Sequence, residues 1–186
     1  MIRETIVTTQ DRDGRCHVAP IGVRELADER LVIAPFRPSA TLDNLLARGC
    51  AVVNHCDDVR VFAGCVTGRR DWPALPAERI DGVRLAGAIA HREVVVAEVE
   101  DDELRPRLIC RTVHRAAHAP FAGFNRAQAA VVEGAILVSR LHMLPAVKVD
   151  TEIAYLAIAV DKTAGPVERE AWGWLMDKIA AWKARV

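Results

Sequence analysis

Apolar and polar residues alternate with a period of two over the first part of the chain, which predicts β-strands. Residues 2–9 (IRETIVTT) form the first such run, and Asp13-Gly14 after it is a typical hairpin turn signal. Residues 15–23 then predict a returning strand. Pro20 within it indicates an edge or a bulge, because proline cannot donate to a strand ladder. Residues 30–36 and 50–56 predict two further strands, the latter buried on both faces.

The pattern changes between these strands and again after residue 124. Residues 40–48 predict a helix that ends at Gly49, and residues 57–68 predict a short helix capped by Asp57 or Asp58. Residues 69–82 contain two prolines and turn residues and are predicted to be a loop. Two long strand-like runs, 84–100 and 106–118, are joined by an acidic turn. Three helical patterns follow, at 125–144, 146–163 and 167–186, with Gly165-Pro166 as a break.

This order predicts a mainly β, α+β fold. Strands joined by hairpins favour an antiparallel barrel over a parallel sheet. We expect a barrel domain over residues 1–124, with inserted helices, and a C-terminal three-helix extension over residues 125–186.

Composition excludes several classes of protein. Basic and acidic residues balance at 25 each, so no overall basic field would attract nucleic acid or an anionic membrane. The five cysteines have no CxxC spacing, which argues against a disulfide framework or a structural zinc site. The N-terminus does not read as a signal peptide, and no apolar run has the length of a membrane span. We therefore expect a cytoplasmic protein.

The junction between the third strand and the first helix is a candidate anion site. Arg37, Ser39 and Thr41 lie where a helix presents unpaired N–H groups and the positive end of its dipole. An anion binds readily at such a position. The alternative is a simple helix cap, in which Ser39 or Thr41 accepts from the backbone and Arg37 is solvated.

Other candidates carry less specific signals. Asn54 ends a buried strand, where its amide either caps a turn or faces the edge of a heterocycle. Arg126 follows the helix cap Asn125 at a position unfavourable for a cation, which favours contact with an anion or with Glu133. His114 and His118 share a strand face about 13 Å apart, at roughly 3.3 Å per residue, so we expect no shared metal. No nucleophile elbow, P-loop or GxGxxG motif is present.

The ordered series ETIVTT, APIGV, FRPSATLDNLL, VVNHCDD and GFNRAQAAVVEGAILVSR resembles a known family over nearly the whole chain. It is similar to the domain-of-unknown-function 447 family, within the FMN-binding split-barrel group related to flavin reductases and pyridoxamine-phosphate oxidase. The resemblance implies an antiparallel split barrel, FMN as cofactor and a homodimer with flavin at the interface. It also implies a flavoprotein that is an oxidoreductase of unknown substrate. The alternative is a non-catalytic module that binds flavin or another cofactor and acts as a carrier, sensor or assembly partner.

The resemblance also implies the residues of the cofactor site. Arg37, Ser39 and Thr41 would hold the flavin phosphate. The isoalloxazine would lie along Ala19, Pro20 and Ile21, with Asn54 near its polar edge, and Asn125 and Arg126 would reach flavin or substrate from either subunit. Many relatives carry a hydroxyl residue two places after this Asn, where the present chain has Cys56. No residue is expected to be an obligatory acid or base, and the expected partners beyond the second copy are a small substrate or an electron donor, without nucleic acid or membrane.

Overall fold

The structure is a computed structural model that describes residues 1–185; the last residue of the third predicted C-terminal helix, 186, lies outside the described residues. The chain divides into two compact units. The barrel unit comprises residues 1–56 and 71–121, and the helical unit comprises residues 57–70 and 122–186. The sequence analysis assigns residues 57–70 to the barrel domain, whereas the structure groups them with the helices.

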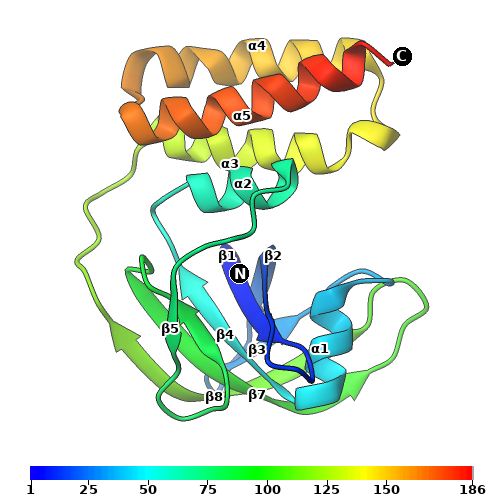
Figure 1. The fold of residues 1–186 in the computed structure, drawn as a ribbon, viewed down its shortest axis with the longest axis vertical. Helices are drawn as coiled ribbons and strands as arrows, with labels where there is room; N and C mark the ends of the chain where they lie inside the picture. Colours follow the sequence, from blue (N-terminus) through cyan, green and yellow to red (C-terminus); the bar gives the residue numbers. More distant parts are fainter. Residues whose placement is uncertain (186) are drawn as a thin grey trace. The chain divides into compact units, whose positions relative to one another are not determined.

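The barrel unit is a closed antiparallel barrel of six strands in the order β1-β2-β3-β8-β7-β4 (Figure 1). Its strands are β1 (Ile2–Gln10), β2 (Cys16–Glu25), β3 (Arg30–Ile33), β4 (Cys50–His55), β7 (Ala90–Glu100) and β8 (Arg107–Ala117). The predicted antiparallel barrel is therefore confirmed. The β1–β2 turn forms as predicted: Gly14 has φ 82°, a region that favours glycine, and Asp11 accepts from two N–H groups of the turn.

Helix α1 (Ala40–Arg48) closes one end of the barrel. Its Leu42 and Leu45 belong to the same buried cluster as Val7, Val53 and other strand residues. Asn44 donates to the hydroxyl of Thr9 at 3.0 Å, which fixes the helix against β1. The helix ends as predicted at Gly49, whose φ of 67° is left-handed.

A second, smaller sheet covers part of the outer face of the barrel. It pairs β5 (Ala74–Pro76), which lies in the region predicted to be a loop, with β6 (Val83–Leu85). The single strand predicted over residues 84–100 is thereby wrong in one respect, because β6 and β7 are separate strands joined by a turn.

The helical unit contains α2 (Arg60–Thr67), α3 (Arg126–Ser139), the short 3-10 turn η1 (Leu141–Met143), α4 (Ala146–Thr163) and α5 (Pro166–Lys183). The three predicted C-terminal helices and the break at residues 165–166 are confirmed. A Cβ at Gly134 would lie 3.1 Å from Leu175, so glycine permits the close approach of α3 and α5. The N-cap of α2 is Val59, which offers no side-chain cap, but Asp58, one of the two predicted caps, accepts from the N–H of Arg60 at 3.0 Å. The Arg60 side chain links α2 to Glu170 on α5 at 3.2 Å.

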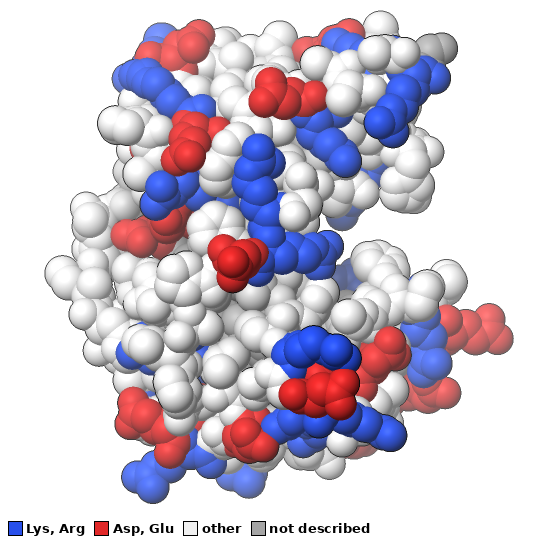
Figure 2. Space-filling view, viewed as in Figure 1, with Lys and Arg blue, Asp and Glu red and all other residues white. Residues whose placement is uncertain are grey.

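Charge is mixed on the face of the molecule that Figure 2 shows. On the face drawn in Figure 2, Lys and Arg side chains alternate with Asp and Glu side chains, in agreement with the balanced composition. Within residues 1–185, no helix is both long enough and apolar enough to cross a membrane.

Candidate functional site

The junction between β3 and α1 is built as a capped helix start. Ser39 is the N-cap residue, and its hydroxyl accepts from the N–H of Leu42 at 3.3 Å. Thr41 lies in the first turn of the helix and is only 2% exposed. The junction therefore combines the positive end of a helix dipole with two hydroxyl side chains.

Arg37 lies two residues before this cap and is held in place from two directions. Its N–H donates to the carbonyl of Leu104 at 2.8 Å, and its guanidinium pairs with Asp101 at 2.5 Å. The Asp101 side chain is 81% exposed, so this ion pair is of the weak surface type. The guanidinium is thus positioned near the helix start without being committed to a buried partner.

The segment Ala19–Ile21 lies on a free edge of the barrel. Strand β2 pairs with β3 only at Arg24 and Glu25, so residues 19–21 have a ladder partner on the β1 side alone. The edge predicted from Pro20 is confirmed. Arg24 of β2 pairs with Val32 of β3, so the end of β3 falls opposite Val23. The chain that leads on to Arg37 therefore leaves β3 beside the unpaired part of β2.

Asn54 is used inside the protein. It is fully buried, and its amide nitrogen donates to the carbonyl of Ile6 at 3.0 Å and to the hydroxyl of Thr8 at 3.1 Å. Its amide oxygen accepts from the N–H of Leu85 at 2.8 Å. This side chain links β1, β4 and β6 and does not cap the following turn, which was the structural alternative in the sequence analysis. These bonds explain its burial, and we leave Asn54 out of the cofactor site.

Thr8, Asn54, His91 and Glu93 form a buried polar layer between the barrel and the segment 77–85. The Glu93 carboxylate accepts from the N–H groups of Glu78, Arg79 and Ile80 at 2.6, 2.7 and 3.0 Å. Burial by itself raises the pKa of Glu93, but these donors together with His91 outweigh it and hold the pKa below its ordinary value. Glu93 is therefore an ionised, buried anchor for the segment that joins β5 and β6.

Three histidines gather next to this anchor. The strand register places His114 opposite Glu93, and it places His91 opposite Ala116, midway between His114 and His118. The ring of His91 lies 5.1 Å from that of His118 and 5.7 Å from that of His114, between ring centres. His91 Nδ1 is 2.9 Å from His118 Nε2, and His91 Nε2 is 3.3 Å from Glu93.

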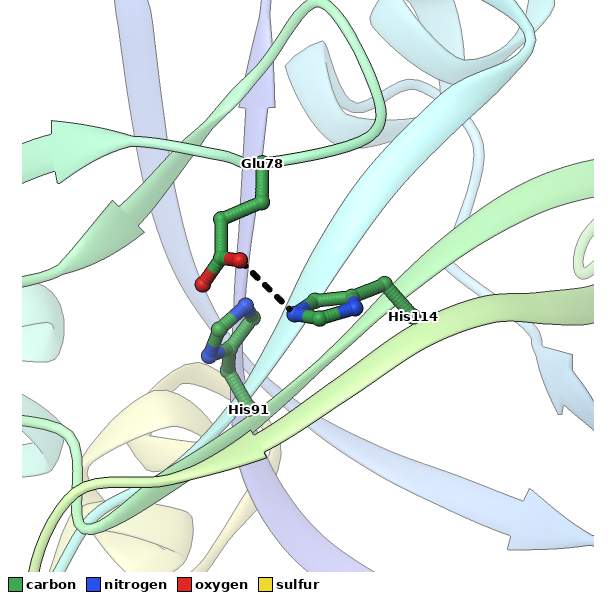
Figure 3. A group of neighbouring side chains, drawn as sticks. All are labelled: Glu78, His91 and His114. Atoms are coloured by element: carbon green, nitrogen blue, oxygen red, sulfur yellow. Dashed lines mark ion pairs between the residues drawn. The ribbon is translucent and has the colours of Figure 1, made fainter.

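Glu78 completes this group from the neighbouring loop. Figure 3 shows its carboxylate and the rings of His91 and His114 turned toward one another. Glu78 Oε2 lies 3.4 Å from His114 Nε2. The sequence analysis considers His114 and His118 of the HRAAH motif as a pair. It does not identify His91 as their neighbour, because His91 lies on the adjacent strand β7.

Asn125 and Arg126 belong to the helical unit. Asn125 is the N-cap of α3, as predicted: its side-chain oxygen accepts from Ala127 at 2.7 Å, and its amide donates to the carbonyl of Thr163 at 3.2 Å. Arg126 is exposed and lines a mainly apolar groove of about 270 Å³ between α3 and α4, together with Glu133 and Tyr155. Asn125 thus has a structural role in this unit, whereas Arg126 remains open to solvent.

Two family models match the chain. Residues 3–119 match the N-terminal domain of the protein family of unknown function DUF447, and residues 125–177 match a second model of the same family. The chain belongs to this family. The family resemblance expected from the sequence is therefore confirmed.

Solved structures extend the comparison to the fold. An FMN-bound DUF447 protein from Methanosarcina mazei is 19% identical with a TM-score of 0.81, and the match covers 95% of this chain and 94% of that one. The 2-nitrobenzoate 2-nitroreductase of Pseudomonas fluorescens is 23% identical with a TM-score of 0.55, over 61% of this chain and 64% of that one. Flavoredoxin of Desulfovibrio vulgaris is 12% identical with a TM-score of 0.53, over 63% and 70%. This DUF447 protein thus shares its fold with flavoproteins of the split-barrel type.

Proposed function

We propose that this DUF447 protein binds FMN through the β3–α1 junction. The observation that carries the proposal is the capped start of α1, which has Ser39 and Thr41 at its first turn and follows Arg37, whose guanidinium pairs with the exposed Asp101. The FMN bound to the Methanosarcina mazei relative supports the identity of the ligand.

The residues present fit a phosphate group. A phosphate monoester carries roughly −1.5 to −2 charges near neutral pH and offers three acceptor oxygens. Thr41 supplies a hydroxyl donor, the helix start supplies N–H groups and a positive dipole end, and Arg37 supplies a guanidinium that can leave its exposed partner Asp101. The unpaired edge at Ala19–Ile21 offers backbone groups and apolar side chains against which a flat ring system can lie.

The flavin would supply the redox chemistry, with this chain binding and orienting it. An oxidoreductase role is supported by the nitroreductase and flavoredoxin among the structures of similar fold. A specific observation also favours a second candidate, a flavin-binding module without turnover. Residues 77–85 are fastened to the barrel by Asn54 and Glu93, so this segment is closed against the barrel.

The test of the proposed function is the visible absorption spectrum of the purified protein, followed by titration of the flavin-free protein with FMN and with riboflavin. We expect a flavin spectrum and tighter binding of FMN, because riboflavin lacks the phosphate. Protein that binds neither flavin contradicts the proposal. Reduction of the bound flavin by a nicotinamide donor under anaerobic conditions then separates the oxidoreductase from the module.

We further propose that the protein is a homodimer. Tyr155 and Val147 on α4 are 76% and 77% exposed, and Phe36 beside the β3–α1 junction is 62% exposed, which is a large apolar exposure for a free surface. Light scattering is expected to give twice the chain mass of 20.4 kDa. A stable monomer that still binds flavin contradicts this proposal.

A further inference from the structure

The group formed by Glu78, His91 and His114 has the composition of a metal site that neither the sequence analysis nor the family match assigns. The three side chains each offer one ligand atom, and these atoms all lie within 4.8 Å of one another. We propose that this group binds a divalent first-row transition metal, with Zn²⁺ as the favoured ion.

The donor atoms suit this class of cation. Two imidazole nitrogens and one carboxylate oxygen match the ligands that Zn²⁺ takes at sites with three protein ligands and one open position. Metal–ligand bonds of about 2.0–2.1 Å in a tetrahedron place neighbouring ligand atoms roughly 3.3–3.4 Å apart. Glu78 Oε2 and His114 Nε2 already stand 3.4 Å apart.

One of these atoms lacks a partner in the protein. His114 Nε2 is buried and has no hydrogen bond within the described chain, because its contact with Glu78 does not have hydrogen-bond geometry. An orphaned ring nitrogen facing a carboxylate is costly as it stands. A cation between the two atoms satisfies both at once.

His91 is the buried ligand, and its orientation is set by its neighbours. Its side chain is fully buried, and Nδ1 faces His118 at 2.9 Å, which leaves Nε2 for the metal. Without metal, Nε2 shares a proton with Glu93 at 3.3 Å. When the metal takes Nε2, that ring carries its proton on Nδ1 instead, and His118 accepts from it. Such an outer partner is the usual companion of a metal-binding histidine.

Glu93 positions the third ligand without binding the metal. It accepts from the backbone N–H of Glu78 itself at 2.6 Å and from the next two N–H groups, so the loop that presents the Glu78 carboxylate is held in place before any metal arrives. The Glu78 side chain is 56% exposed, which gives an ion a path from solvent and leaves room for a water at the fourth position.

The test measures Zn²⁺ binding to the whole chain by titration calorimetry after treatment with a chelator, in a Cys16→Ser background that removes the exposed thiol. We expect one Zn²⁺ per chain. Glu78→Gln and His114→Ala should each weaken binding by about 100-fold, and His118→Ala by about tenfold because it removes an outer partner. His142→Ala, an exposed histidine of the helical unit, is the matched control and should leave the affinity unchanged.

Two further measurements make the result decisive. Zn²⁺ should raise the thermal midpoint of the parent protein and not that of Glu78→Gln. The Glu78 side chain is exposed, so this substitution should not disturb folding by itself. Co²⁺ should give the absorption of a tetrahedral nitrogen and oxygen site, read at wavelengths beyond those of flavin. The proposal is overturned if the chain takes up no Zn²⁺, if Glu78→Gln and His114→Ala bind it like the parent, or if Co²⁺ shows thiolate ligation. Each of these outcomes is independent of flavin binding.

Discussion

Replacing Glu93 by Gln is expected to lower the free energy of unfolding of the barrel unit by about 3 kcal/mol at neutral pH, measured by urea unfolding with a chelator present. The carboxylate uses both oxygens: one accepts from Glu78, and the other accepts from Arg79 and Ile80. An amide keeps one oxygen and turns an NH₂ group toward the remaining donors. Buried N–H groups that face a donor lose their hydrogen bonds and cannot regain water.

The same change should have a local signature. Amide hydrogen exchange at residues 78–80 should be faster in Glu93→Gln by about 100-fold, because each 1.4 kcal/mol is a factor of ten in the opening equilibrium. Glu98→Gln is the matched control, since Glu98 lies exposed on the same strand β7, and its effect should stay within about 0.5 kcal/mol. A Glu93→Gln protein as stable as the parent would show that this carboxylate does not hold the segment.

The parts of the fold that the sequence predicted correctly are those determined by neighbouring residues. The Asp13-Gly14 turn, the end of α1 at Gly49 and the break at Gly165-Pro166 each depend on a backbone conformation that a few residues dictate. The helical period after residue 125 likewise depends on one continuous stretch. These signals are local, so they are readable without knowledge of the rest of the chain.

The small β5–β6 sheet shows why other parts were missed. β5 has only three residues and ends in proline, so its local pattern is that of a loop. Its surroundings are held by distant partners: Thr8 donates to the carbonyl of Val83 across 75 residues, and Asn54 accepts from Leu85 across 31. The bond between Asn54 and Leu85 also explains why the role of Asn54 was not predicted. A buried amide needs partners, but only the tertiary structure shows that the protein supplies them all.

The histidine group was missed for a related reason. The spacing argument places His114 and His118 on one strand, where they lie too far apart to share a metal. The register of β7 against β8 brings His91 between them, and a shift in that register between Glu93 and Val94 determines which residues of β8 lie opposite which of β7. Such irregularities are not visible in a hydrophobic pattern. For the β3–α1 junction, in contrast, the sequence predicted the helix start and offered Ser39 as one of two caps, but it did not predict the pairing of Arg37 with Asp101.

Replacing Arg37 by Ala is expected to weaken FMN binding by about 10- to 100-fold, which is the loss of a charge-assisted contact to phosphate. Thr41→Val removes only the hydroxyl from a nearly buried residue of the same shape, and we expect a loss of about fivefold. Riboflavin, which has no phosphate, should bind each variant as it binds the parent. Fluorescence titration with the two flavins measures both quantities.

Substitution of Asp101 is the most informative control for this experiment. Arg37 pairs with Asp101, so a phosphate must compete with that carboxylate for the guanidinium. Asp101→Asn removes the competitor and should leave FMN binding equal or a few-fold tighter, whereas Arg12→Ala in the β1–β2 turn should change nothing. If Arg37→Ala lowers the affinity for FMN and riboflavin equally, the phosphate lies elsewhere. If Asp101→Asn weakens FMN as much as Arg37→Ala does, the ion pair matters for the shape of the β3–α1 junction rather than for holding the phosphate.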